Sequence, residues 1–152
     1  MSRAFIKETD DAQEIVLDRP ISSHPNFVTP QGLALIERSL SAASAEYDAA
    51  QSRGDRAAIA RTAREWRYWT SRRGSAQVVL PRSTNSARFG STVTISRGDG
   101  RIQTFQIVGE DEADPARGLL SHVSPLARAL MGSNAGDVVH FGASDAEIVK
   151  IE

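Results

Sequence analysis

The chain has 152 residues, no cysteine and a formal net charge of −1. This composition suits one domain or two small ones and excludes disulfides and thiolate metal sites. Hydrophobic residues make up 40% and charged residues 24%, as in ordinary globular proteins. No apolar run approaches the roughly 20 residues of a membrane span, and the N-terminus shows no apolar signal segment. We therefore expect a cytoplasmic protein without membrane contact. The three histidines are far apart in the sequence, so we expect no metal site and no cofactor of its own.

Residues 1–26 are predicted to form a mostly extended arm. Pro20 and Pro25 disfavour a helix there. The short apolar run at 15–17 is expected either to pack on the body or to pair as an edge strand.

Residues 27–74 carry two consecutive heptad patterns, which predict an antiparallel helical hairpin. Thr29 and Pro30 form a helix start, Gly54 ends the first helix, and Asp55 is placed to cap the second, which Gly74 closes. The apolar positions are Leu33, Ile36, Leu40, Ala43, Tyr47 and Ala50, then Ile59, Thr62, Trp66 and Trp69. The product is a rod about 30 Å long, although the pattern also fits a hairpin inside a compact core.

The aromatic side chains of the second helix allow two interpretations. Trp66 and Trp69 have the spacing of the hairpin seam, and packing there is favoured over stacking on a nucleic-acid base. Tyr68 lies off the seam and is the better candidate for an exposed contact.

Residues 75–152 change to a period of two, which predicts strands. We expect strands at 76–80, 92–96, 102–108, 137–141 and 147–151, a hairpin turn at Gly98-Asp99-Gly100, and one short helix at 126–131. The predicted fold class is therefore α+β: a helical hairpin followed by an antiparallel β domain with one short helix.

Charge is distributed unevenly along the chain. Residues 53–73 contain seven arginines against two acids, and residues 110–114 contain four acids and no base. The basic helix face comprises Arg53, Arg56, Arg61 and Arg64. It is either a solvated helical surface or a contact for nucleic acid or an acidic protein.

The stretch VGEDEADPARGLLSHVSPLARALMG at 108–132, followed by GDVVHF at 136–141, resembles the C-terminal domain of the GreA/GreB transcript cleavage factors of bacterial RNA polymerase. The pieces SAQV at 75–78 and FGSTV at 89–93 are similar to that family as well, and the resemblance extends over residues 27–152. It implies an N-terminal coiled coil and a C-terminal domain with an FKBP-like fold.

The resemblance also implies a partner and a mode of action. The C-terminal domain would dock at the rim of the polymerase secondary channel, and the coiled coil would enter the channel toward the active-site magnesium. We expect a monomer that binds bacterial RNA polymerase, with nascent RNA in the channel as a candidate second contact. The density of family-like polar residues assigns the docking surface to Asp111, Asp114, Ser124, Pro125 and Arg128.

The sequence departs from the family at the hairpin tip. Cleavage-active members carry a pattern like G-D-L-x-E-N, whose acids help hold a magnesium ion in the polymerase active site. Here Asp55 matches the first acid, but Ala58 and Ile59 replace the glutamate and the asparagine. The second helix is also shorter by about ten residues, or on the order of 15 Å. Asp55 is therefore predicted to be a helix cap rather than a magnesium ligand.

The sequence is compatible with three functions. The first is a polymerase-binding regulator with weak or absent cleavage stimulation. The second is an active cleavage factor that uses Asp55 and Asp48, although these residues would lie about 10 Å apart along the axis. The third is a prolyl isomerase, suggested by the FKBP-like fold alone, which is a poor guide to activity.

Overall fold

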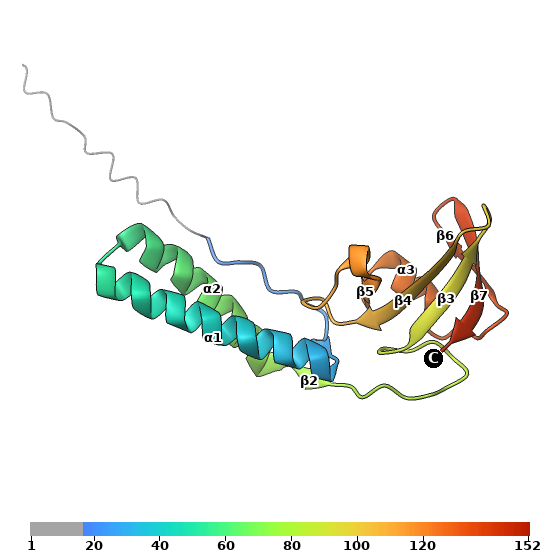
Figure 1. The fold of residues 1–152 in the computed structure, drawn as a ribbon, viewed down its shortest axis with the longest axis horizontal. Helices are drawn as coiled ribbons and strands as arrows, with labels where there is room; N and C mark the ends of the chain where they lie inside the picture. Colours follow the sequence, from blue (N-terminus) through green and yellow to red (C-terminus); the bar gives the residue numbers. More distant parts are fainter. Residues whose placement is uncertain (1–16) are drawn as a thin grey trace, which may run out of the picture.

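The computed structural model describes residues 17–152 and shows two bodies arranged end to end, a helical hairpin and a sheet domain (Figure 1). The hairpin comprises α1 (Pro30–Arg53) and α2 (Arg56–Ser75). The α+β prediction with a projecting hairpin is confirmed, and the compact-core alternative is wrong. Of the apolar run at 15–17, Ile15 and Val16 lie outside the described residues, and Leu17 is exposed.

Local capping rules explain where the two helices begin and where α1 ends, whereas α2 continues through Gly74 to Ser75, so the prediction that Gly74 closes it is wrong. The Thr29 hydroxyl accepts a hydrogen bond from the Gly32 amide (2.9 Å), and the Asp55 carboxylate accepts one from the Ala58 amide (3.1 Å). Gly54 adopts a left-handed φ of 65°, which a glycine takes without strain and which lets α1 end in a tight connection. The connection is so short that the helices must run antiparallel.

The interface between the two helices uses small side chains more than the sequence pattern predicts. On α1, Ile36, Ala43 and Ala50 are buried as predicted. On α2 the buried residues are Ala58 and Arg72, whereas Trp66 remains 39% exposed. Trp66 instead stacks on Tyr47 of α1, with ring centroids 5.1 Å apart, at the margin of the interface.

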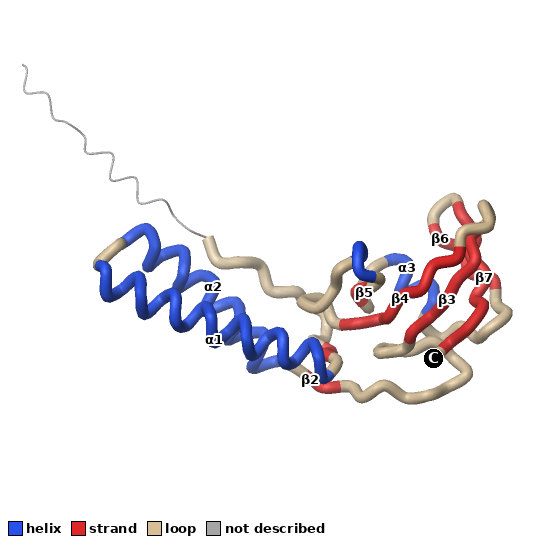
Figure 2. Tube along the Cα trace, in the orientation of Figure 1, coloured by secondary structure: helices blue, strands red, loops and turns tan. Residues whose placement is uncertain are grey.

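The sheet domain is built on a five-stranded sheet in the order β5-β4-β3-β7-β6 (Figure 2). Its elements are β3 (Thr92–Arg97), β4 (Ile102–Val108), the 3-10 helix η1 (Pro115–Arg117), β5 (Leu119–Ser121), α3 (Pro125–Leu130), β6 (Val138–Phe141) and β7 (Ser144–Ile151). One face of the sheet and α3 enclose a core that includes Val93, Ile95, Ile107, Leu130 and Ile148.

The prediction of a purely antiparallel β domain is wrong in two places. β5, which the sequence pattern did not reveal, pairs parallel with β4. The expected strand at 76–80 shrinks to β2 (Gln77–Val78), which pairs parallel with β1 (Phe27–Val28) and stays outside the main sheet. β1 precedes α1 and β2 follows α2, so this small ladder closes the root of the hairpin.

Candidate functional site

The hairpin tip carries the residues that the sequence assigns to chemistry. Asp55 lies at the connection between the helices, and its carboxylate is engaged by the Ala58 amide of its own helix. Ala58 is 5% exposed and faces the helix interface. Of the two positions where the family pattern has acids, one is therefore a carboxylate, Asp55, and the other a buried methyl group, Ala58. Among the described residues, no group of three potential metal ligands occurs.

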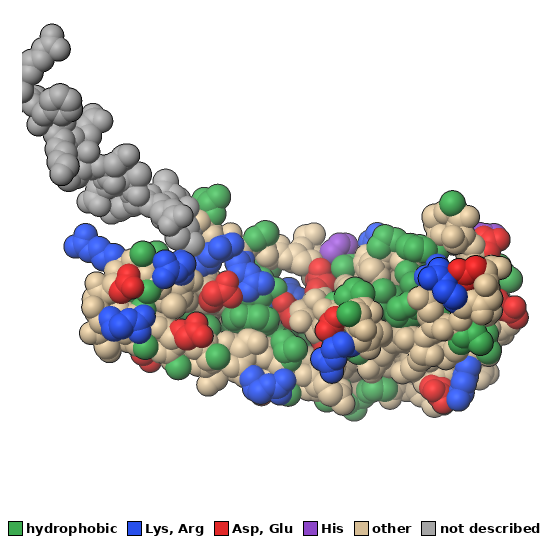
Figure 3. All heavy atoms as spheres, turned by 45° about the horizontal axis from the view of Figure 1, so that its top comes forward, with side chains coloured by type: hydrophobic (Ala, Val, Ile, Leu, Met, Phe, Trp, Pro, Cys, Tyr) green, Lys and Arg blue, Asp and Glu red, His purple; other side chains and the backbone are tan. Residues whose placement is uncertain are grey.

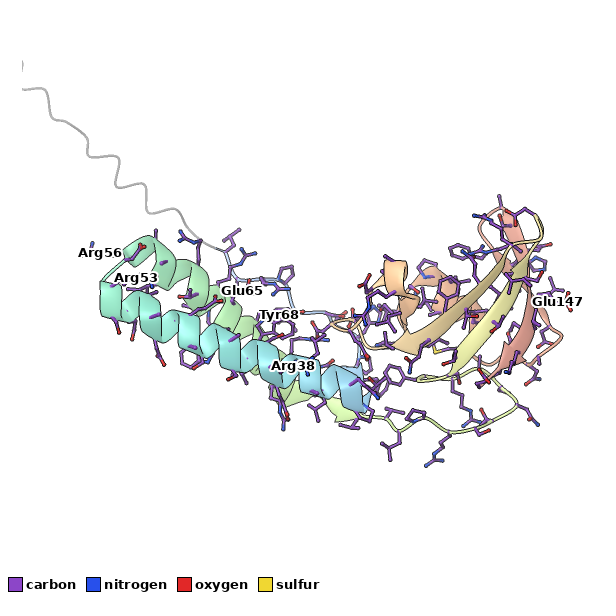
Figure 4. The ribbon with its side chains drawn as sticks, viewed as in Figure 1. Arg38, Arg53, Arg56, Glu65, Tyr68 and Glu147 are labelled. Atoms are coloured by element: carbon purple, nitrogen blue, oxygen red, sulfur yellow. The ribbon has the colours of Figure 1, made fainter. Side chains whose placement is uncertain are left out.

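The predicted basic face of the hairpin, to which α1 contributes Arg53 and α2 the other arginines, is interrupted by acids. Arg53 and Arg56 project at the far end of the hairpin, whereas Glu65 lies further along α2 (Figure 4). A hollow of about 380 Å³ beside Ala58 is lined by both Arg53 and Arg61 and by both Glu46 and Glu65. Figure 3 likewise shows arginine and acidic side chains intermingled over the hairpin. The surface is mixed rather than uniformly basic.

Residues 17–26 run beside α2 and form ion pairs with its charged side chains. Arg19 donates to Glu65 (2.8 Å), and its guanidinium lies 3.6 Å from the Tyr68 ring centroid. Asp18 accepts hydrogen bonds from Arg67 (2.6 Å). This segment therefore covers part of the α2 surface between the tip and the sheet domain.

The densest polar cluster lies where the hairpin meets the sheet domain, and we call it the junction. It comprises Asn26, Thr29, Tyr68, Arg72 and the acidic turn 110–112. The Arg72 guanidinium donates to Asp111 (2.6 Å) and to Asn26 (2.8 Å), and Tyr68 donates to the same Asp111 carboxylate. Burial, followed by this hydrogen bond, raises the pKa of Tyr68 to about 12.

An aromatic cluster continues the junction on its sheet-domain side. The His122 ring packs against Phe27 and Phe89, with centroids 5.5 and 5.4 Å away. Burial lowers the pKa of His122, because the charged imidazolium would lose its hydration there. The hairpin root and the sheet domain thus share both polar and apolar contacts.

The candidate docking residues separate into two groups. Asp114 precedes η1, and Ser124, Pro125 and Arg128 lie at and within α3; both η1 and α3 contact β5. Pro125 and Arg128 are exposed, whereas Ser124 accepts a hydrogen bond from the Ala127 amide as the cap of α3.

Asp111 does not join that surface. Its side chain is only 6% exposed, and its carboxylate accepts hydrogen bonds from Arg72 and Tyr68. The structure therefore speaks against Asp111 as a surface carboxylate for docking, and Tyr68 is half-buried rather than fully exposed; polymerase contact at these residues stays a prediction.

Comparison with known proteins identifies the C-terminal part of the chain. Residues 82–152 match the family model described as "Transcription elongation factor, GreA/GreB, C-term". The chain is 43% identical over 96 residues to transcription elongation factor GreB of Neisseria meningitidis, a match that covers 59% of each chain. It is 46% identical over 82 residues to transcription elongation factor GreA of Paracoccus denitrificans, covering 50% of this chain and 53% of that one.

The chain carries a C-terminal domain of the GreA/GreB family, over residues 82–152. Its similarity to these relatives spans somewhat more than half of their length. Among solved structures, the GreA factor homolog 1 (Gfh1) protein of Thermus thermophilus is similar, with a TM-score of 0.42 and 19% identity over 85% of this chain and 99% of that one.

Sequence reasoning missed the junction residues Asn26 and Arg72. One signal was available for Arg72. The seam positions Ile59, Thr62, Trp66 and Trp69 continue in steps of three and four to residue 72 or 73, where arginines stand. A charge in a continuing seam indicates a buried partner, which the sequence could not identify because Asp111 lies 39 residues away.

Proposed function

We propose that this chain binds bacterial RNA polymerase through its C-terminal domain, places its hairpin in the secondary channel, and stimulates transcript cleavage weakly or not at all. The observation that carries the proposal is the hairpin tip. A C-terminal domain of the GreA/GreB type follows a hairpin whose single tip acid, Asp55, caps a helix. The protein would act as an accessory factor rather than as an enzyme in its own right.

The tip is poorly suited to supply a magnesium ligand. Magnesium requires near-octahedral oxygen ligation and usually keeps several waters, so one additional carboxylate gives limited help. Arg53 and Arg56 are exposed on either side of the connection that carries Asp55, and their positive charge disfavours a second cation there. The same charges would suit contact with RNA or with acidic residues of the channel.

The alternative of an active cleavage factor predicts a different use of Asp55. Asn caps a helix about as well as Asp, so Asp55→Asn preserves the cap and removes the charged ligand. If the wild-type protein cleaves a backtracked transcript strongly and Asp55→Asn does not, then Asp55 is a ligand and the non-cleaving proposal is wrong. The prolyl isomerase alternative gains no support from the comparisons.

The proposal is tested by co-purification with RNA polymerase, followed by transcript cleavage on a stalled, backtracked complex at saturating protein. We expect binding with little cleavage. Ala58→Glu restores the missing acid, but into a hollow lined by Arg53 and Arg61, so we expect at most a small gain. Ala57→Glu, at the exposed neighbouring position, is the matched control for added charge.

The docking surface is tested separately. We expect Arg128→Glu to weaken polymerase binding by about tenfold or more, because charge reversal at an interface affects association and specificity. Arg101→Glu, at the exposed turn between β3 and β4, is the control. Equal binding by both variants at moderate salt would show that α3 is not at the interface.

A further inference from the structure

Arg72 is the largest fully buried side chain in the described chain, at 2% exposure. Its guanidinium bonds Asn26, which precedes β1, and Asp111, which follows β4; Glu110 lies 3.7 Å away. One side chain from the end of α2 therefore joins the N-terminal segment, the hairpin and the sheet domain.

We propose that Arg72 is a positioning residue that fixes the direction of the hairpin relative to the sheet domain. The proposal rests on the proposed function, because the direction of the hairpin determines where its tip lies when the sheet domain is docked.

The covalent connection cannot set this direction. Between β2 and Ser86, the first residue that pairs with the sheet domain, the chain runs through residues 79–85, which contain no helix or strand. Such a loop limits how far the two bodies separate but not how they are oriented. The orientation therefore depends on contacts across the junction.

Stability alone does not account for a buried arginine at this position. Buried ion pairs are weak evidence for stability, since the loss of hydration offsets the attraction of the charges. Their best-supported use is to select one arrangement over others. An apolar side chain would fill the same volume but would tolerate sliding, whereas the planar guanidinium fork requires its partners in fixed places.

The partners of Arg72 are themselves held in place. Asn26 donates its amide N–H to the backbone carbonyl of Arg72 (2.8 Å) while its Oδ1 accepts from the guanidinium. Asp111 also accepts from Tyr68 one turn earlier on α2. Each partner therefore makes at least two hydrogen bonds to α2, which determines rotation as well as separation.

Small errors at the root are amplified at the tip. The 24 residues of α1 span about 36 Å, so a tilt of about 10° at the root displaces the tip by about 6 Å. Displacements of only about 1 Å can reduce the rate of a positioned reaction by about 100-fold. Loss of Arg72 should therefore impair what the tip does more than it impairs docking.

The test measures hairpin direction in the isolated full chain and tip placement on polymerase. The protein has no cysteine, so spin labels can be placed at Ser41→Cys on α1 and Ala143→Cys in the β6–β7 turn, both exposed. The variants are Arg72→Met and Arg72→Met/Asp111→Asn, the second of which removes the carboxylate charge left unpaired by the first. Arg73→Met is the control, because Arg73 is exposed on the same turn and pairs with Glu37.

We expect a single narrow distance distribution for wild type and Arg73→Met, and a broadened one for both Arg72 variants at unchanged helical circular dichroism. On polymerase, a photocrosslinker attached at Ser52→Cys near the tip should give about tenfold less crosslinked product in the Arg72 variants than in the wild type. The dissociation constant for polymerase should stay within about twofold of the wild-type value.

An unchanged distance distribution in the double variant would overturn the proposal, and so would a broadened distribution with full crosslinking. If Arg72→Met fails to fold, the double variant decides. If the wild-type protein does not bind polymerase, the proposed function fails, while the distance measurement still decides whether Arg72 sets the direction.

Discussion

Tyr68 is a phenol placed between a carboxylate and a guanidinium. It donates to Asp111, and Arg19 lies over its ring. Burial disfavours the charged phenolate, and only the protonated phenol can donate this hydrogen bond, so the pKa of Tyr68 rises to about 12 from 10.0. The unfolded chain therefore loses this proton at lower pH than the folded chain does.

This difference predicts a dependence of stability on pH. Because the folded-state pKa of Tyr68 is raised, its contribution is fully present below pH 10 and is lost as the pH rises toward 12. We expect the urea midpoint of the wild-type protein to fall between about pH 10, the ordinary tyrosine pKa, and about pH 12. Tyr68→Phe should show a smaller fall; equal slopes would mean that Tyr68 does not titrate differently on folding.

Asp55 offers a second test at the scale of one side chain. The only hydrogen bond of its carboxylate among the described residues is accepted from the Ala58 amide, within the same helix. We expect Asp55→Ala to reduce the free energy of unfolding by about 0.5–2 kcal/mol and Asp55→Asn to leave it nearly unchanged. Chemical denaturation of the two variants checks this; equal losses would mean that the carboxylate charge, not the cap, stabilises the tip.

Short-range rules made single residues predictable. The caps at Thr29, Asp55 and Ser124 follow from a polar side chain and an amide three residues later. The roles of Asp111 and Arg72 depend on a contact between residues 39 positions apart. No local pattern distinguishes an acid that faces solvent from one that faces a buried guanidinium.

At the scale of elements, the two helices of the hairpin pack through a narrow strip of small side chains, with an aromatic pair at its edge. Ala43, Ala50 and Ala58 are nearly inaccessible, which lets the helices approach closely. The large aromatic pair, Tyr47 and Trp66, stacks beside that strip rather than within it. Apolar periodicity located the correct helices but assigned Trp66 to their centre.

This position changes the expected cost of truncating Trp66. A fully buried Trp→Ala typically loses about 3–5 kcal/mol. With 39% of Trp66 exposed, we expect about 1–3 kcal/mol, so the hairpin should be weakened but not melted. Of that loss, about 0.5–1.5 kcal/mol should be coupling to Tyr47, measurable in a double-mutant cycle with Tyr47→Ala. Zero coupling would show that the stacking contributes nothing.

The strands show why topology was harder to predict than strand existence. The turn Gly98-Asp99-Gly100 correctly predicted the β3–β4 hairpin, because consecutive strands were joined by a short turn. β5 has only three residues, and β1 and β2 have two each. Their parallel pairing joins segments distant in sequence, which alternation of apolar residues does not report.

For the whole molecule, the decisive feature is how closely the sheet domain meets the hairpin root. The acidic turn 110–112 contributes three side chains to the junction: Glu110 and Asp111 toward Arg72, and Glu112 toward Thr29. The acidic turn, in which the sequence analysis placed part of the docking surface, thus makes contacts within the molecule instead. The surface near η1 and α3 remains available for a partner.

Gly109 tests this close approach without changing any charge. A Cβ at Gly109 would lie 2.3 Å from the carbonyl oxygen of Phe27 in β1, a separation that forces backbone to move. We expect Gly109→Ala to reduce the free energy of unfolding by about 1–3 kcal/mol or more, as other overpacked sites do. Gly98→Ala is the matched control, because nothing lies within 4 Å of a Cβ there.

The two variants separate a junction effect from a general effect of adding a methyl group. If Gly109→Ala displaces β1 from the end of β4, then urea denaturation should show the loss, and the spin-label distances between Ser41→Cys and Ala143→Cys should shift as well. The helical circular dichroism should be retained, because α1 and α2 bury their interface against each other. Equal stability of Gly109→Ala and Gly98→Ala would mean that the sheet domain does not press against the hairpin root at Gly109, and the rigid relation between the two bodies would then depend on the side-chain contacts of the junction, Arg72 among them.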